Sequence, residues 1–434
     1  MDLTKKFENL IQYEGNNRIV FLNPENNHWA RMSKQYYTAI CQDLEKKEQL
    51  IEKFHNDFDL FGGGTETSNI RSIYFSVTNK CNLQCSFCTM NSGPDVSTEE
   101  DLTLDEIQKM LIPKLKEISP KKIIITGGEP VMRKDILKIL EVFAEAFGKE
   151  RVLLQTNGLL LTEKFIDEVK EYVSTVEISI ENIFENITLL LRMKKIFRRI
   201  RKNNLTLSLS FVLDEDSEPY FRDAADLCEE YEGILTLRIV TLVGRAIDSG
   251  RYQREESQEI EMVQKYYHYF SYLLEKDYLD DRFILGYLDN LQPKKSCGAF
   301  GKILSIFSDG TTYMCGNFKE SDYSMGNIRS KTMAEIVENL DQKMLDEEMR
   351  NRFLVSQNLV CQTCPENYFC PGPCIAEVAE NGGVMEKVDS KCLSKRAMIH
   401  FNLFYYDRRK SNKDNFQALT DFLREVIDEK ITFS

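Results

Sequence analysis

The sequence lacks the features that would place the protein in a membrane or send it out of the cell. No apolar run in its 434 residues approaches the roughly 18 residues that a membrane span needs. The first residues, Met1 to Lys6, do not form the apolar stretch of a secretory signal peptide. We therefore expect a cytoplasmic protein with no membrane partner.

The chain also lacks a histidine cluster, an excess of positive charge, internal repeats and low-complexity segments. Its four histidines (His28, His55, His268 and His400) are scattered and indicate no metal site. Lys and Arg number 56 against 69 Asp and Glu, so the net charge of -13 disfavours broad binding to DNA. Apolar residues make up 42% and charged residues 29%, which is typical of a soluble globular protein, and the length favours several domains.

Cysteine, in contrast, is abundant. Twelve cysteines in a chain without an export signal disfavour disulfides, because cytosolic thiols stay reduced. Cys41 and Cys228 lie apart from the rest among apolar neighbours, and we expect both to be small buried residues. The other ten form two groups, for which metal binding is the preferred explanation: Cys81, Cys85 and Cys88, then Cys297, Cys315, Cys361, Cys364, Cys370, Cys374 and Cys392.

The middle of the chain alternates short apolar runs with amphipathic helical patterns, which predicts βα units, a parallel sheet and the α/β fold class. Thr103 and Glu106, for example, form a capping box ahead of one helix. The six expected strands are Ile73 to Val77, Lys122 to Thr126, Val152 to Gln155, Val176 to Ile180, Leu205 to Val212 and Leu235 to Val240.

The two ends of the chain have a different character. Three β-favouring runs, 10–13, 18–22 and 28–32, precede helical patterns at 34–44 and 47–56, and the segment Gly62 to Thr65 predicts a flexible linker. From Cys297 onward cysteine-rich loops dominate, with a helix around 333–350 and an amphipathic terminal helix from Phe416 to Ile427.

The first cysteine group directly follows the first of the six strands. Cys81, Cys85 and Cys88 have no fourth Cys or His nearby, which disfavours a structural zinc knuckle and suits an iron-sulfur cluster with one open iron. The motif Cys-X3-Cys-X-aromatic-Cys, with Phe87 as the aromatic, resembles that of the radical S-adenosylmethionine (radical SAM) enzymes. The resemblance implies that these cysteines hold a 4Fe-4S cluster, which binds SAM and cleaves it with one electron to a 5′-deoxyadenosyl radical.

Further segments resemble the family at the ends of the other strands: Thr126-Gly127-Gly128-Glu129-Pro130, Gln155 to Gly158, Glu177 to Ile180 and Thr241 to Ala246. Alone, each is an ordinary turn. In this order, at the carboxyl ends of parallel strands, they indicate the site of a partial (β/α)6 barrel. The resemblance implies that SAM contacts Phe87, Gly127, Gly128, Glu129, Pro130, Asn157, Ser179 and Leu242.

The seven cysteines of the second group resemble the SPASM domain of radical SAM enzymes that modify peptides and proteins; zinc ribbons or disulfides are the alternatives. The resemblance implies two auxiliary 4Fe-4S clusters, one on Cys361, Cys364, Cys370 and Cys392, the other on Cys297, Cys315 and Cys374. The second set lacks a fourth cysteine, since residues 289–296 contain none, which leaves an open position, an oxygen ligand or a substrate ligand. Gly316 follows Cys315 where the sulfatase-maturating relatives carry Asp, which disfavours that activity.

The expected domains are a winged-helix-like α+β unit at 1–65, the barrel at 70–250, a helical linker at 251–289, a loop-rich SPASM domain at 290–400 and a terminal helix at 401–434. The first resembles, in pattern only, the PqqD-like domain that binds the leader of a precursor peptide by edge-strand addition. Trp29 and Tyr36 could line its groove, although core packing is the preferred role of both. A nucleic-acid-binding winged helix is the alternative.

The resulting hypothesis is a radical SAM maturase that installs an intramolecular crosslink in a ribosomally synthesised precursor peptide, with a thioether favoured and a carbon-carbon bond as the alternative. Its cofactors would be SAM and three 4Fe-4S clusters, and its partners the precursor peptide and an electron donor such as flavodoxin or ferredoxin. Alternatives are epimerisation, decarboxylation or residue oxidation, a redox-sensing protein, and a nucleic-acid-modifying enzyme. The last would use the basic segment Arg192 to Lys202, whose preferred interpretation is a solvated helix face.

Overall fold

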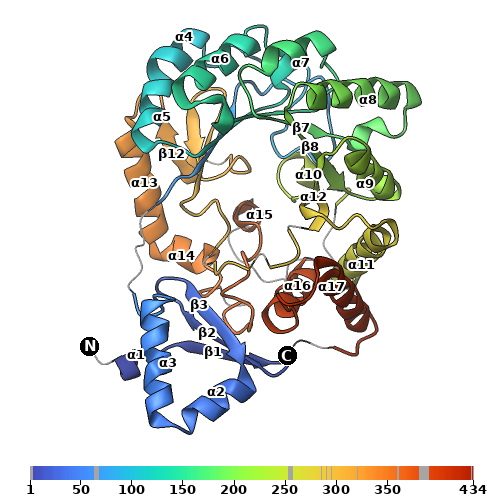
Figure 1. The fold of residues 1–434 in the computed structure, drawn as a ribbon. Coiled ribbons are helices and arrows are strands. Elements are labelled where there is room, and N and C mark those ends of the chain that lie inside the picture. Colours follow the sequence, from blue (N-terminus) through green and yellow to red (C-terminus); the bar gives the residue numbers. More distant parts are fainter. Residues whose placement is uncertain are drawn as a thin grey trace.

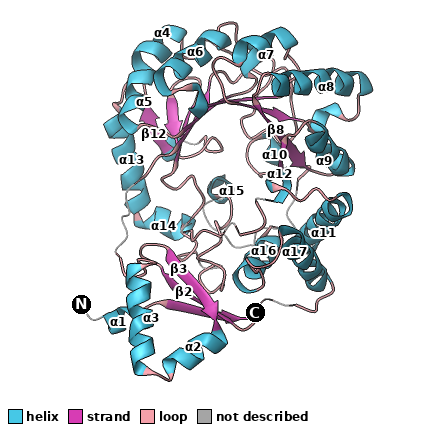
Figure 2. Ribbon diagram, in the orientation of Figure 1, coloured by secondary structure: helices cyan, strands magenta, loops and turns pink. Residues whose placement is uncertain are grey.

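The computed structural model describes residues 3–62, 68–252, 258–284, 286–289, 291–294, 296–319, 321–358, 361–380, 391–431 and 433. A barrel-like sheet with outer helices lies at one end of the molecule, and a small three-stranded unit lies at the other (Figure 1). Loops and short helices of the cysteine-rich region lie between them (Figure 2).

All six predicted strands form, and they lie side by side in chain order with parallel neighbours. They are β4 (Ser72–Ser76), β5 (Lys122–Thr126), β6 (Val152–Thr156), β7 (Thr175–Ser179), β8 (Thr206–Leu213) and β9 (Ile234–Ile239). The helices between them are α4 (Leu104–Glu106), the π-helical turn η1 (Ile107–Leu111), α5 (Ile112–Ile118), α6 (Ile136–Phe147), α7 (Glu163–Val169), α8 (Ile187–Lys202) and α9 (Phe221–Glu230). The α/β fold class is confirmed.

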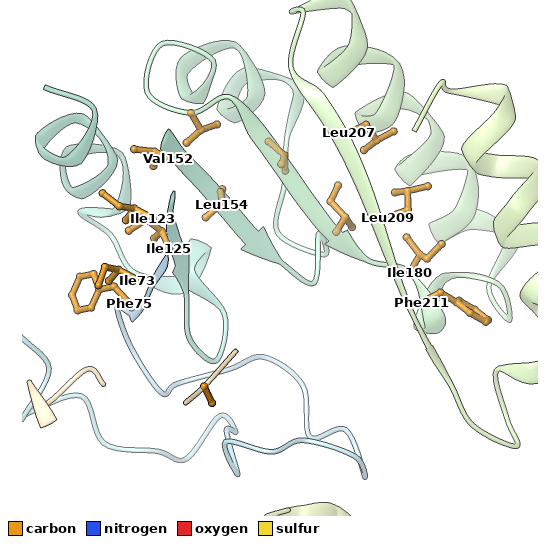
Figure 3. Packing of buried hydrophobic residues seen from close by; sticks show 14 of the residues in the cluster. Ile73, Phe75, Ile123, Ile125, Val152, Leu154, Ile180, Leu207, Leu209 and Phe211 are labelled. Carbon is orange, nitrogen blue, oxygen red and sulfur yellow. The ribbon is translucent and has the colours of Figure 1, made fainter. Parts of the chain in front are cut away.

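Alternation along the strands divides the sheet into two chemically different faces. Successive side chains of a strand point to opposite faces, and Ile73, Phe75, Ile123 and Ile125 belong to the buried core under the helices (Figure 3). Several intervening positions carry polar side chains that line the cavity inside the barrel, such as Gln155 and Glu177, whereas Ile124 and Leu153 are apolar. The barrel therefore has an apolar layer under its helices, and polar side chains gather inside it near the carboxyl ends of the strands.

The sheet is longer than the sequence pattern predicted. Three short strands, β10 (Ile303–Ile306), β11 (Thr311–Tyr313) and β12 (Ser324–Asn327), extend it beyond β4, and β10 pairs with β4 in parallel. These strands lie among cysteine-rich loops and are too short for a clear alternation. Their pairing joins the second cysteine region directly to the barrel.

The basic helix α8 belongs to the barrel wall. Met193, Ile196, Phe197 and Ile200 are its buried residues. Its cations form bonds to neighbouring elements: Arg199 Nε to Asp167 Oδ1 at 2.6 Å, Lys194 Nζ to Glu230 Oε2 at 2.7 Å and Arg201 Nη2 to Glu232 Oε2 at 2.6 Å. These contacts support the preferred interpretation of an amphipathic barrel helix over a nucleic-acid footprint.

The amino-terminal unit contains α1 (Leu3–Glu8), the antiparallel strands β1 (Ile11–Gly15), β2 (Arg18–Asn23) and β3 (His28–Ser33), and helices α2 (Lys34–Cys41) and α3 (Leu44–Asn56). One face of its sheet has its own core, in which Phe7, Phe21 and Phe54 contact one another. Most of the predicted linker, residues 63–65, lies outside the described residues. Cys41 is exposed at the end of α2, so the expectation that it is buried was wrong; Cys228 is buried as expected.

The other face of this small sheet is docked on the carboxyl-terminal region. Val20 and Leu22 pack with Phe369, Leu403 and Phe404. Trp29 also packs there, with its ring 5.2 Å from that of Phe369, whereas Tyr36 is exposed. Side chains of the unit also donate hydrogen bonds to backbone carbonyls at and beyond the end of α16, where helical carbonyls lack partners. The pairs are Arg18 with Tyr406, Asn16 with Phe404 and Arg31 with Asn402. The unit is therefore not independent of the rest of the chain.

The remaining helices follow β9 in the chain. They are α10 (Arg245–Asp248), α11 (Gln258–Lys276), α12 (Asp281–Ile284), α13 (Met333–Leu345), α14 (Glu347–Phe353), α15 (Ile375–Glu380), α16 (Cys392–Phe404) and α17 (Asn412–Ile427). The helix predicted around 333–350 is divided into two helices at Asp346. The backbone of Asp346 is not helical, and its side chain caps α14 by accepting a hydrogen bond from the Met349 backbone N–H. Within the described residues, no helix combines the length and apolar character needed to cross a membrane.

Candidate active site and metal-binding cysteines

A cavity of about 530 Å³ opens where the carboxyl ends of the barrel strands meet. Most of the residues predicted to bind the cluster and SAM line it: Cys81, Cys85, Phe87, Cys88, Gly127, Gly128, Asn157 and Ser179. Cys315 and Gly316, from the second cysteine region, line the same cavity. The extension of the sheet by β10 and β11 brings Cys315 to this position.

The three cysteines of the first group lie on one loop that the surrounding backbone holds in place. Cys81 donates its backbone N–H to Gly93, and Cys88 donates to Cys85, at 3.0 and 3.2 Å. Burial raises the pKa of the Cys81 thiol and raises that of Cys85 to about 11. A buried thiolate is unfavourable without a compensating cation, and bound iron would supply one.

The donor set fits an iron-sulfur cluster, whose usual protein ligands are cysteine thiolates. All twelve cysteines are free thiols. In the described parts of the chain, no three Cys, His, Asp or Glu side chains form a ready-made site for one ion. Cys81, Cys85 and Cys88 would hold such a cluster through their thiolates, and the cluster would supply electron transfer.

Two glycines allow the loop after β5 to lie directly on the cysteine loop. A Cβ on Gly127 would meet the carbonyl oxygen of Thr78 at 2.3 Å, and one on Gly128 would meet that of Lys80 at 2.3 Å. Gly127 also has a φ of +146°, which other residues rarely adopt. Backbone bonds join the loops, from Gly128 to Thr78 at 2.8 Å and from Glu129 to Lys80 at 2.9 Å. The glycines thus serve loop packing, a role that the sequence did not reveal.

Gly128→Ala is expected to separate these loops, lower stability by about 1–3 kcal/mol and weaken SAM binding, because the new methyl group would collide with backbone. Thermal unfolding and SAM titration would measure both effects. Gly233→Ala is the matched control, since its Cβ would meet nothing closer than Leu207 at 3.4 Å. Equal behaviour of the two variants would contradict this account.

Three predicted SAM contacts are not on the cavity wall. Glu129 is fully buried, and its carboxylate accepts hydrogen bonds from Thr156 Oγ1 at 2.7 Å, the Asn157 backbone at 2.8 Å and the Val131 backbone at 3.0 Å. Burial raises the pKa of this carboxyl. Pro130 is also buried, and the cavity is lined by Thr241 instead of Leu242. Glu129 therefore positions Asn157, which lines the cavity.

A polar array on the inner wall was missed in the sequence. Glu177 Oε1 accepts from Gln155 Nε2 at 2.9 Å and Arg238 Nη2 at 2.6 Å, and Arg238 Nε donates to Ser210 Oγ at 2.7 Å. Glu181 also lines the cavity, and burial raises its pKa to about 7. The available signal was the alternation of polar and apolar residues within predicted strands, as in Leu207-Ser208-Leu209-Ser210.

Cys297, Cys315 and Cys374 come together beside the barrel. Burial, together with the charges of the other two thiols, raises the pKa of Cys315 to about 12. Backbone N–H groups of Ile375 and of Ala376 point to the thiols of Cys297 and Cys374, respectively. The three residues expected to share a cluster are thus close in space although they span 78 positions of sequence.

The second set also assembles, next to the docked amino-terminal sheet. Burial raises the pKa of the Cys392 thiol to about 12, and the nearby thiols of Cys370 and Cys364 raise it further by smaller amounts. Cys361 and Cys364 share one turn. The buried Glu366 accepts from Arg396 Nε at 3.2 Å and contacts His400 Nδ1 at 3.0 Å. His400, to which the sequence assigned no role, therefore belongs to the surroundings of this set.

Comparisons with known proteins support two domains. Residues 75–228 match the family model of the Radical SAM superfamily, and residues 297–365 match that of the SPASM iron-sulfur cluster-binding domain. Curated relatives include the GTP 3′,8-cyclase of Clostridium perfringens SM101, 29% identical over 39% of this chain and 55% of the relative. The probable GTP 3′,8-cyclase of Methanocaldococcus jannaschii is 30% identical over 39% of this chain and 58% of the relative. The chain thus spans about half the length of the curated relatives it matches.

Solved structures match over more of the chain. Streptococcus suis SuiB bound to S-adenosylmethionine aligns with 89% of this chain and 99% of its own at a TM-score of 0.55 and 13% identity. SuiB bound to precursor peptide SuiA aligns with 88% of this chain and 100% of its own, at a TM-score of 0.53 and 14% identity. Native anSMEcpe with bound AdoMet aligns with 82% of this chain and 99% of its own, at a TM-score of 0.54 and 15% identity. At these identities the likeness establishes the shared fold.

Proposed function

We propose that this chain, which contains a radical SAM domain followed by a SPASM domain, is a peptide maturase that installs an intramolecular crosslink in a ribosomally synthesised precursor. The observation that carries the proposal is the shared cavity, whose wall contains the cysteines of the barrel loop and also Cys315. A substrate in this cavity would lie between the source of a radical and an acceptor of electrons. The similarity in fold to SuiB, solved with a precursor peptide, supports a peptide as the substrate.

Each cysteine set has one role in this proposal. Cys81, Cys85 and Cys88 would hold the cluster that binds SAM and supplies a radical able to remove a hydrogen atom from an unactivated carbon. Cys297, Cys315 and Cys374 would hold one auxiliary cluster, and Cys361, Cys364, Cys370 and Cys392 the other, for a total of three. Crosslinking removes one hydrogen atom, one proton and one electron, and an auxiliary cluster would be the acceptor for that electron.

The protein's own residues would orient the substrate and keep water out. Glu129 holds Asn157 on the cavity wall, and Glu177 holds Arg238. The guanidinium of Arg238 and the carboxyl of Glu181 provide polar groups for peptide carbonyls or for the proton released on bond formation. These polar groups suit this task because hydrogen bonds within the wall already orient them.

The amino-terminal unit would bind the precursor's leader in the manner of a PqqD-like domain. Its three-stranded sheet has β1 and β3 as its two edges, and an extended peptide can pair with such an edge. The sheet is docked on Phe369, beside Cys370, and on α16, which begins at Cys392, so a bound leader would lie next to this set of cysteines. A cytoplasmic location and a flavodoxin or ferredoxin as electron donor belong to the same proposal.

We favour a thioether product. Cys297, Cys315 and Cys374 provide three ligands, which leaves a position for a substrate thiolate, the form of cysteine that binds metal. Incubation of the reconstituted enzyme with small peptides encoded beside it is expected to give a product lighter by about 2 Da. After reduction, the product cysteine should not react with iodoacetamide.

The same experiment distinguishes the alternatives. A product that loses about 2 Da but keeps a reactive cysteine would replace the thioether with a carbon-carbon bond. An unchanged mass with an inverted centre would indicate epimerisation. Peptide-independent turnover of GTP, the substrate class in the names of the curated relatives, would contradict the peptide proposal.

A further inference from the structure

One buried contact joins the barrel cavity to the second cysteine region. Glu377 lies on α15, near the centre of the molecule (Figure 1), and is only 1% exposed. Its Oε1 accepts a hydrogen bond from the backbone N–H of Leu242 at 2.6 Å. Bonds of this kind, between a carboxylate and a backbone donor, are among the strong hydrogen bonds of proteins.

The two ends of this contact belong to different sites. Leu242 follows β9, and its neighbours Val240 and Thr241 line the cavity. Glu377 lies three residues after Cys374, and its backbone N–H points to the Cys374 thiol. A single side chain therefore connects the cavity wall with the segment that carries a proposed cluster ligand.

Other bonds hold the same loop from two further directions. Lys391 Nζ donates to the Val240 carbonyl at 3.3 Å, and Lys391 directly precedes Cys392. Arg245 donates from Nη1 to the Cys85 carbonyl at 2.9 Å and from Nη2 to the Ser92 carbonyl at 2.6 Å. The loop at 240–245 is thus a junction that contacts segments of all three cysteine sets.

We propose that Glu377 is a positioning residue that fixes the loop at 240–242 for SAM binding by tying it to the segment that carries Cys374. Without the Glu377 carboxylate, the Leu242 N–H loses its partner and the cavity wall formed by Val240 and Thr241 is no longer held from the SPASM side. The inference rests on the SAM-binding part of the proposed function and not on the peptide, so it can be tested without a known precursor.

The test compares variants of the full-length, reconstituted protein by SAM titration and iron content. Glu377→Ala is expected to weaken SAM binding about tenfold with iron content unchanged. Glu377→Gln should stay within about threefold of the parent, because its amide oxygen can still accept from Leu242. Glu377→Asp keeps the charge but is one methylene too short, so it should resemble alanine.

Val378→Ala is the matched control, since it removes packing from the same buried helix without touching the bond to Leu242. It should change SAM affinity less than about twofold.

If Glu377→Ala does not fold, the contrast between the other two variants decides. Weaker SAM binding in Glu377→Asp than in Glu377→Gln supports the proposal, and the reverse order overturns it. SAM binding unchanged in Glu377→Ala, or equal losses in Glu377→Ala and Val378→Ala, would also overturn it. Loss of about four irons in Glu377→Ala would instead assign the carboxylate to a cluster.

Discussion

Replacement of Cys81, Cys85 and Cys88 together with alanine is expected to abolish SAM cleavage and to lower the iron content from about 12 to about 8 per chain. The three thiols lie on one loop and line one cavity, so no other cysteine of the barrel can replace them. The SPASM sets lie on other segments and should keep their iron. Iron analysis and 5′-deoxyadenosine production after anaerobic reconstitution measure the two effects.

Cys41→Ala provides the control for this variant. Cys41 is exposed on α2 and lies outside both cysteine groups, so its loss should change neither iron content nor SAM cleavage. Continued production of 5′-deoxyadenosine by the triple variant would exclude the radical SAM assignment of this loop. Loss of all iron would show instead that the three sets do not load independently.

Deletion of residues 1–62 is expected to reduce turnover of a micromolar full-length precursor by about two orders of magnitude, because the leader would lose its edge-strand partner. The deletion also exposes Phe369, Leu403 and Phe404, each of which contributes about 1.5–3 kcal/mol when buried. Peptide turnover, SAM cleavage without peptide and thermal unfolding should therefore be measured together. Turnover unchanged by the deletion would contradict leader recognition.

A second variant separates recognition from docking. Arg18→Ala with Arg31→Ala removes bonds to carbonyls of Tyr406, Asn402 and Leu403 but leaves the three strands intact. This variant should lower the unfolding temperature and still bind the leader. The experiment requires the full chain, because a detached unit would expose Val20, Leu22 and Trp29 to water.

Local patterns predicted the barrel well because its strands are short apolar runs and most of its helices have apolar residues at helical spacing. In β4, Ile73 and Phe75 alternate with more polar residues, whereas β5 contains the continuous apolar run Ile123-Ile124-Ile125. Thr103 with Glu106 forms the expected capping box. The prediction was weaker where elements are short or meet distant segments. The β10–β12 extension and the division at Asp346 were missed for this reason.

The sequence by itself determined the six parallel strands, the order of the motifs at their ends and the two groups of cysteines, because spacing and periodicity are properties of the chain alone. Tertiary structure decided what these parts contact. It placed Cys315 in the same cavity as Cys81, buried Glu129 away from that cavity, and put Glu377 on Leu242. It also docked the amino-terminal sheet on Phe369 and left Cys41 exposed. These contacts join residues that are mostly tens to hundreds of positions apart, and no local pattern encodes such pairings.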